Sequence, residues 1–126
     1  MQDEPTPIEL AKAVADFLRG DIAPMISGHN AFKLRVAINA LELVVRQLTL
    51  EEGSDAAEAE RLARLLETQG SLLGQNHALA EKIASGGLDL DTPGLSEHLW
   101  QTTMAKLAVD QPNYASYKRE LGRERR

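Results

Sequence analysis

The apolar residues of this sequence recur at the spacing of α-helices, and no stretch alternates as a β-strand would. Thr6, Pro7 and Glu9 form a capping pattern at the start of the first expected helix, residues 7–19. Counted from Leu10, apolar residues then recur at i, i+4, i+7 and i+8. The same periodicity returns in residues 30–48, 54–69, 72–85 and 93–110. The sequence therefore predicts an all-α fold, an irregular bundle of about five helices in a single domain.

Glycine, proline and small polar residues set the expected boundaries. Gly20 is expected to end the first helix, residues 49–54 (TLEEGS) to separate the second from the third, and Pro112 to follow the last long helix. We expect a helical bundle domain over residues 1–112. Residues 113–126 are expected to form a basic C-terminal tail with one short helix and disorder after it, because Tyr114, Tyr117 and Leu121 share one helical side.

Composition and charge exclude several classes of function. The chain has 126 residues, no cysteine and a net charge of −5, so disulfides and thiolate metal sites are excluded. The last nine residues hold five bases and two acids, a charge of +3, which leaves −8 on the rest. An acidic body disfavours nucleic acid and anionic membranes as partners. The N-terminus does not resemble a signal peptide, and no apolar run reaches the roughly 20 residues of a membrane span. We therefore expect a cytoplasmic protein.

Four polar residues are interspersed among the apolar residues of the most apolar predicted helix, residues 30–48. At 100° per residue, they fall within a strip about 60° wide, with an apolar surface on each shoulder. We call this strip the polar lane: Arg35, Asn39, Glu42 and Arg46. One shoulder is the main apolar face, and the other consists of Phe32, Val36 and Leu43. A helix that is apolar on two sides is usually central, with neighbours on both.

The polar lane has three interpretations. The first is a structural network, in which Glu42 pairs with Arg46 at i, i+4 and Arg35 holds the amide of Asn39. The second is an interface with a protein partner. The third is a ligand site in which Arg35 offers donors to a carboxylate or phosphate.

Two further helices carry residues of interest. Asn76 falls on the apolar face of residues 72–85, where it is expected to cap or bond a neighbouring loop; a link to Asn39 stays open. In residues 93–110, Trp100 is expected to anchor the core and His98 to face outward.

The sequence lacks the common signatures of catalysis and of metal binding. None of the three histidines has a glutamate three residues before it, as the ligand pair of a di-iron bundle requires. Phosphate-binding glycine loops and a serine–histidine–acid pattern are absent as well. We accordingly expect no catalytic residue, metal or cofactor.

Four stretches together are similar to a known family: residues 2–18 (QDEPTPIELAKAVADFL), 32–44 (FKLRVAINALELV), 70–83 (GSLLGQNHALAEKI) and 92–114 (TPGLSEHLWQTTMAKLAVDQPNY). They resemble an uncharacterised family of small bacterial helical domains of unknown function. Its members are typically encoded beside aminoglycoside-phosphotransferase-like kinases and acyl-CoA dehydrogenases. The resemblance implies an accessory role near acyl-CoA metabolism or small-molecule phosphorylation, and it assigns no catalytic residue.

These observations favour a non-enzymatic helical accessory or interaction module. Its expected partner is a kinase-like or acyl-CoA dehydrogenase protein, and self-association into a homodimer stays open. The alternative is a bundle that binds an acyl-thioester or phosphate-bearing ligand through Arg35 and Asn39. The binding or interface candidates are Arg35, Asn39, Glu42, Arg46, Phe32, Val36, Leu43 and Asn76.

Overall fold

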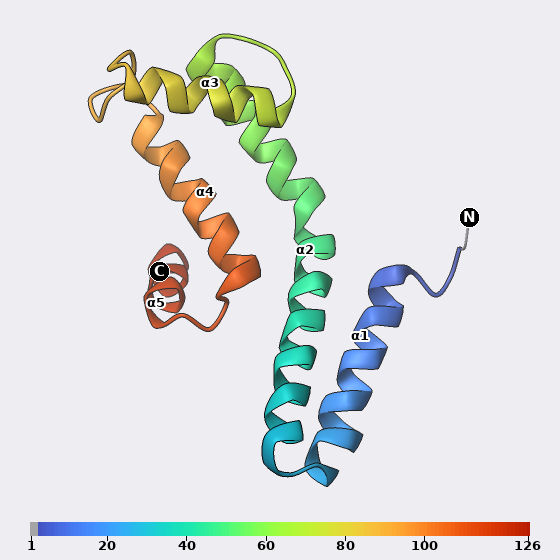
Figure 1. The fold of residues 1–126 in the computed structure, drawn as a ribbon. Coiled ribbons are helices and arrows are strands. Elements are labelled where there is room, and N and C mark those ends of the chain that lie inside the picture. Colours follow the sequence, from blue (N-terminus) through green and yellow to red (C-terminus); the bar gives the residue numbers. More distant parts are fainter. Residues whose placement is uncertain (1–2) are drawn as a thin grey trace. The chain divides into compact units, whose positions relative to one another are not determined.

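A computed structural model describes residues 3–126, and every regular element in that range is helical (Figure 1). The all-α prediction, with five α-helices among the described residues, is confirmed. The elements are α1 (Pro7–Phe17), η1 (Leu18–Ile22), η2 (Ala23–Met25), α2 (Gly28–Leu66), α3 (Leu72–Ala84), α4 (Leu95–Asp110) and α5 (Ala115–Glu124).

The chain divides into two compact units, Met1–Leu50 and Glu51–Arg126, and the division falls inside α2. We call them the N-terminal unit and the C-terminal unit. In the N-terminal unit, α1 lies alongside residues 28–50 of α2 and runs antiparallel to them (Figure 1). Its fully buried apolar side chains are Ala15 of α1 and Ile38 of α2. The N-terminal unit is thus a helical hairpin.

The start of α1 follows the predicted capping box. The Thr6 hydroxyl accepts a hydrogen bond from the Glu9 backbone N–H at 3.2 Å, and the Glu9 carboxylate accepts one from the Thr6 N–H at 2.7 Å. The prediction that Gly20 ends this helix is wrong, because the chain continues through the π turn η1 and the 3-10 turn η2. Gly28, with φ of 68°, makes the turn instead, in the left-handed region that glycine occupies without strain.

The longest element contradicts the expected break at residues 49–54, since α2 runs unbroken for 39 residues. This stretch holds no proline, so no backbone donor is missing from the helix. The Thr49 hydroxyl donates to the Val45 carbonyl at 2.6 Å, four residues back along the same helix. Gly53 costs the helix about 1 kcal/mol relative to alanine and does not end it.

The C-terminal unit has an aliphatic core shared by three helices. Leu62 and Leu66 of α2, Leu79 of α3 and Leu95 of α4 are buried together. Ser71 caps α3 by accepting from the Gly74 N–H at 3.1 Å. Leu95 rather than Pro93 begins α4, because Thr92 closes the preceding turn by accepting from the Asp89 N–H at 2.9 Å.

The inward side of α4 differs from the prediction. His98 is buried, at 2% exposure, while Trp100 is 45% exposed. Apolar side chains lie on every side of α4, so periodicity alone does not identify its buried side. On its inward side, His98 accepts a hydrogen bond from Arg61 of α2.

Candidate interaction surfaces

The polar lane of α2 faces an arginine from another element. Arg19 of η1 donates from Nε to Glu42 Oε1 and from Nη2 to Glu42 Oε2, both at 2.9 Å. The same Nη2 donates to Asn39 Oδ1 at 3.0 Å. The fork of one guanidinium thus holds both an amide and a carboxylate. The hydrogen bond and charge of Glu42 raise the pKa of Arg19 above its usual value.

This arrangement gives Asn39 a partner that the sequence did not indicate. The sequence interpretation placed Arg35 against Asn39, but Asn39 accepts from Arg19. Arg35 is exposed, and its side chain forms no hydrogen bond or ion pair with the rest of residues 3–126. Arg19 lies 20 residues before Asn39 in the chain, and no periodicity within one helix reports a pair at that separation.

A shallow cavity of about 210 Å³ lies beside the lane, between α1 and α2. Its lining is Lys12, Ala15, Asp16, Glu42, Val45 and Arg46. Two of the four lane residues, Glu42 and Arg46, therefore border it, while Arg35 and Asn39 do not. The cavity also places residues 12–16 of α1 abreast of residues 42–46 of α2.

The apolar shoulder predicted on α2 is exposed, so the expectation that a neighbouring helix packs on this side is wrong for the described residues. Phe32 is 56% exposed, Val36 52% and Leu43 36%. Leu50, which is 40% exposed, continues the same side seven residues after Leu43. The ring of His29 stacks on Phe32 with centroids 6.5 Å apart. We call Phe32, Val36, Leu43 and Leu50 the outer strip.

The C-terminal unit contains a polar network that the sequence did not predict. Asn76 of α3 donates from Nδ2 to Glu58 Oε1 at 2.8 Å and to the Leu72 carbonyl at 3.1 Å. Its neighbour Gln75 is buried and donates to the Thr68 carbonyl at 2.9 Å. The two amides therefore tie α3 to α2 and to the loop before α3. The expectation that Asn76 bonds a neighbouring loop is wrong, because Asn76 bonds Glu58 of α2 and Gln75 bonds the loop.

Arg61 links the same region to α4. Its Nε donates to Nδ1 of His98 and its Nη2 to the Thr102 hydroxyl, both at 3.4 Å. Burial lowers the pKa of His98, the charge of Arg61 lowers it further, and Glu58 acts in the opposite direction. A neutral imidazole accepts at Nδ1, whereas a protonated one cannot. The network therefore favours the neutral form of His98.

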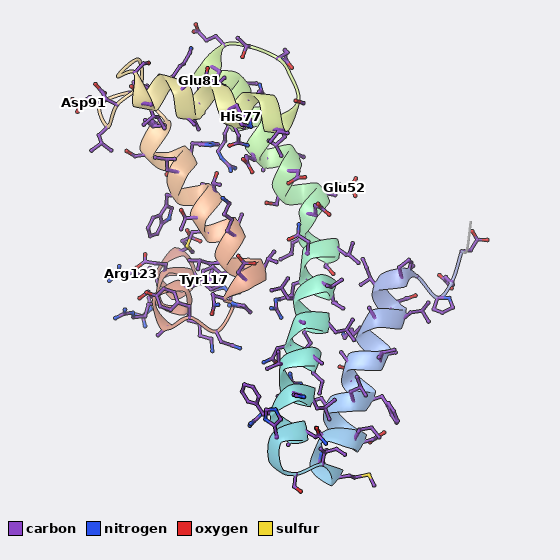
Figure 2. The ribbon with its side chains drawn as sticks, in the orientation of Figure 1. Glu52, His77, Glu81, Asp91, Tyr117 and Arg123 are labelled. Carbon is purple, nitrogen blue, oxygen red and sulfur yellow. The ribbon has the colours of Figure 1, made fainter. Side chains whose placement is uncertain are left out.

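Two cavities open on the C-terminal unit. One, of about 210 Å³, lies between α4 and α5, where Trp100, Met104 and Leu107 face Tyr114 and Tyr117. Tyr117 is labelled on α5 in Figure 2, together with Arg123, which pairs with Glu120 at 2.7 Å. The other, of about 250 Å³, is lined by Arg61, Arg64, Leu65, Pro93, Gly94 and Glu97. The exposed side of Trp100 thus belongs to a groove, not to the core.

The part of the chain that the structure covers shows neither a metal-binding cluster nor a membrane-spanning helix. Residues 3–126 contain no group of three or more histidine, aspartate and glutamate side chains placed to hold a metal ion. Across the same residues, no helix combines the length and the apolarity that crossing a bilayer requires.

Comparison with known proteins gives one result. The sequence model of the family described as "Domain of unknown function (DUF6285)" matches residues 24–114, and the chain belongs to that family. The match includes α2, α3 and α4, and the stretch 2–18 lies before it. Neither curated proteins nor solved structures gave a significant match.

Proposed function

We propose that this member of the DUF6285 family is a non-enzymatic helical interaction module that binds a protein partner through the outer strip. The observation that carries the proposal is the exposure of Phe32 and Val36, at 56% and 52%, on a helix whose opposite side is buried at Ile38. A polar lane on one side and a thin polar edge on the other border the strip. Apolar patches with polar rims are typical of protein interfaces.

The spacing of the strip indicates how it would bind. Phe32, Val36, Leu43 and Leu50 follow one another at i, i+4, i+11 and i+18, which presents a single apolar ridge. A ridge of this kind fits an apolar groove between helices of the partner. His29 stacked on Phe32 restricts the ring before binding, which reduces the entropy lost on association.

The partner class comes from the family resemblance. We propose a kinase-like phosphotransferase or an acyl-CoA dehydrogenase as the partner, which would give the module an accessory role in acyl-CoA metabolism or small-molecule phosphorylation. The acidic balance of the chain, −5 overall, supports a protein partner over nucleic acid.

The test is a titration of the full chain against each purified candidate partner, followed by calorimetry. We expect Phe32→Ala to weaken binding by at least about 30-fold, the size of an interface hot spot. Leu73→Ala, at an exposed apolar position of α3, is the matched control and leaves binding unchanged. Binding that survives Phe32→Ala and Val36→Ala together would contradict the proposal.

The ligand-binding alternative rests on the cavity beside the polar lane. It has less support, because Arg35 and Asn39 do not line that cavity and Asn39 accepts from Arg19. Thermal-shift measurements with CoA esters and nucleotides test it. Stabilisation by a ligand that disappears in Arg35→Ala would favour this alternative over the interaction module.

A further inference from the structure

A second apolar surface lies on the helical hairpin of the N-terminal unit, apart from the outer strip. On α1, Leu10, Val14 and Phe17 recur at i, i+4 and i+7, so they share one side of the helix. They are 46%, 50% and 53% exposed. Ala15, the buried residue of α1, lies about 100° around the helix from Val14, about 140° from Leu10 and about 160° from Phe17.

A matching stripe lies on α2. Val44 and Leu48 are 46% and 45% exposed, and both lie on the shoulder of the buried side away from the polar lane. Because residues 12–16 lie abreast of residues 42–46 in antiparallel helices, Val14 is level with Val44. By the same register, Leu10 is level with Leu48.

The two stripes face the same way. Lys12, Asp16 and Arg19 of α1 and η1 meet Glu42 and Arg46 of α2 on one flank of the hairpin, as the cavity and the ion pair show. The apolar stripes of both helices are turned to the other flank. Together they form what we call the flank face, which includes residues of both helices: Leu10, Val14, Phe17, Val44 and Leu48.

We propose that the flank face is a self-association surface, on which the hairpin of a second copy of this chain packs through a two-fold axis. The product is a four-helix arrangement in which each helix has a neighbour within its own hairpin and one across the interface. This inference concerns a different surface from the outer strip and does not depend on the proposed function.

The area of the flank face suits such a dimer. Five side chains of this size, each about half exposed, present roughly 400 Å² of apolar surface. A standard interface removes about 800 Å² from each partner, of which somewhat more than half is apolar. The flank face therefore supplies nearly all the apolar area that one side of a stable dimer needs.

The charge of the hairpin is compatible with a second copy as the occupant. Residues 1–50 hold six acids and five bases, a net charge of −1, so two hairpins repel each other little. None of the five side chains of the flank face is charged, so the face carries no charge pattern that would select an oppositely charged partner. An uncharged apolar face can meet a rotated copy of itself without placing like charges together.

The limited burial within the hairpin also supports a second copy as the occupant of the flank face. Two antiparallel helices form a single layer, and in the N-terminal unit only Ala15 and Ile38 are fully buried among its described apolar residues. Helical domains are stable when one layer covers another. The second copy supplies that layer.

The test is the mass of the intact full chain in solution, measured by light scattering across a range of concentrations. We expect a mass of two chains, and we expect Val14→Glu and Val44→Glu each to raise the dimer dissociation constant at least tenfold while helical circular dichroism is retained. Leu73→Glu, at a 72% exposed position of α3, is the matched control and keeps the dimer. Phe32→Ala also keeps the dimer, which separates this test from that of the outer strip.

Cross-linking provides a second readout that does not depend on introducing a charge. The chain has no cysteine, so Val14→Cys and Val44→Cys variants carry a single thiol each. We expect oxidation of one variant, or of an equal mixture of the two, to give a covalent dimer. A single-chain mass at every concentration, or a dimer that neither glutamate variant weakens, would overturn the proposal.

Discussion

The two units of this chain differ in how far they bury their apolar side chains. The C-terminal unit gathers Leu62, Leu66, Leu79 and Leu95 into one cluster from three helices. The N-terminal unit fully buries Ile38 and Ala15, and leaves side chains such as Phe17 and Phe32 more than half exposed. A hydrophobic core therefore needs helices on several sides, whereas one hairpin buries side chains only between its two helices.

The units also differ in how they hold their polar groups. Glu42 and Arg19 meet at the surface, with side chains 33% and 47% exposed. In the C-terminal unit, Gln75 and His98 are buried and hydrogen-bonded. A surface pair contributes little to stability, whereas a buried polar group that loses its partner is costly. Substitutions at buried positions should therefore change stability more than substitutions at the surface.

The largest effect is expected from truncating the core of the C-terminal unit. Leu62→Ala removes a fully buried side chain and should lower the free energy of unfolding by about 2–5 kcal/mol. Leu73→Ala, at 72% exposure, is the matched control and should change it by less than about 0.5 kcal/mol. Urea unfolding followed by circular dichroism measures both; equal effects would contradict the assignment of the core.

The next effect tests whether α2 is continuous. Gly53 lies inside the helix, and a Cβ added there meets no atom within 4 Å. Gly53→Ala should therefore raise the free energy of unfolding by about 0.5–1 kcal/mol, because alanine is the better helix former. Gly28→Ala is the control with the opposite sign, since φ of 68° strains any residue with a Cβ. No gain in Gly53→Ala would indicate that residues 49–54 form a loop.

A smaller effect concerns pH and the buried imidazole of the C-terminal unit. The pKa of His98 is lowered in the folded chain, so the unfolded state binds more protons below its ordinary pKa of about 6.5. The contribution of His98 to stability is therefore present above pH 6.5 and is lost as the pH falls through 6.5 toward the folded pKa. His98→Asn, which keeps an acceptor for Arg61, should flatten this part of the pH profile of urea midpoints; an unchanged slope would contradict the account.

The smallest effect is expected at the surface pair of the N-terminal unit. Arg19→Ala removes the donors to Glu42 and Asn39 and should lower the melting temperature slightly. The loss should shrink in 1 M salt, where exposed charges are screened. Arg35→Ala is the matched control, because the Arg35 side chain is exposed and forms no hydrogen bond or ion pair in the described chain. A larger loss in Arg35→Ala would contradict this assignment of the lane.

Much of the fold follows from local patterns in the sequence. The capping box at Thr6 and the serine cap at Ser71 depend on residues three apart, and the structure has both. The break expected at residues 49–54 is wrong because turn-forming residues without proline do not end a helix by themselves. Whether a segment is helical follows from its local sequence, whereas whether two helical segments join into one helix depends on the hydrogen bonds available to the residues between them.

The candidate site could be predicted only in part. Placing Asn39 and Glu42 on one side of a helix requires only the 100° rotation per residue. Their partner Arg19 comes from another element, and helical periodicity says nothing of it. Likewise, the buried His98 has its partner in Arg61, which lies 37 residues earlier, whereas Trp100 is exposed. Contacts between residues of different helices can be identified only once the fold is known.

Amide hydrogen exchange on the intact chain at low and high protein concentration tests the central claim most directly. If the hairpin needs a second copy to cover its flank face, protection in α1 and in residues 28–50 rises with concentration, while α3 and α4 keep the same protection throughout. Protection of the hairpin that is high at every concentration, or that changes equally in both units, would contradict the claim.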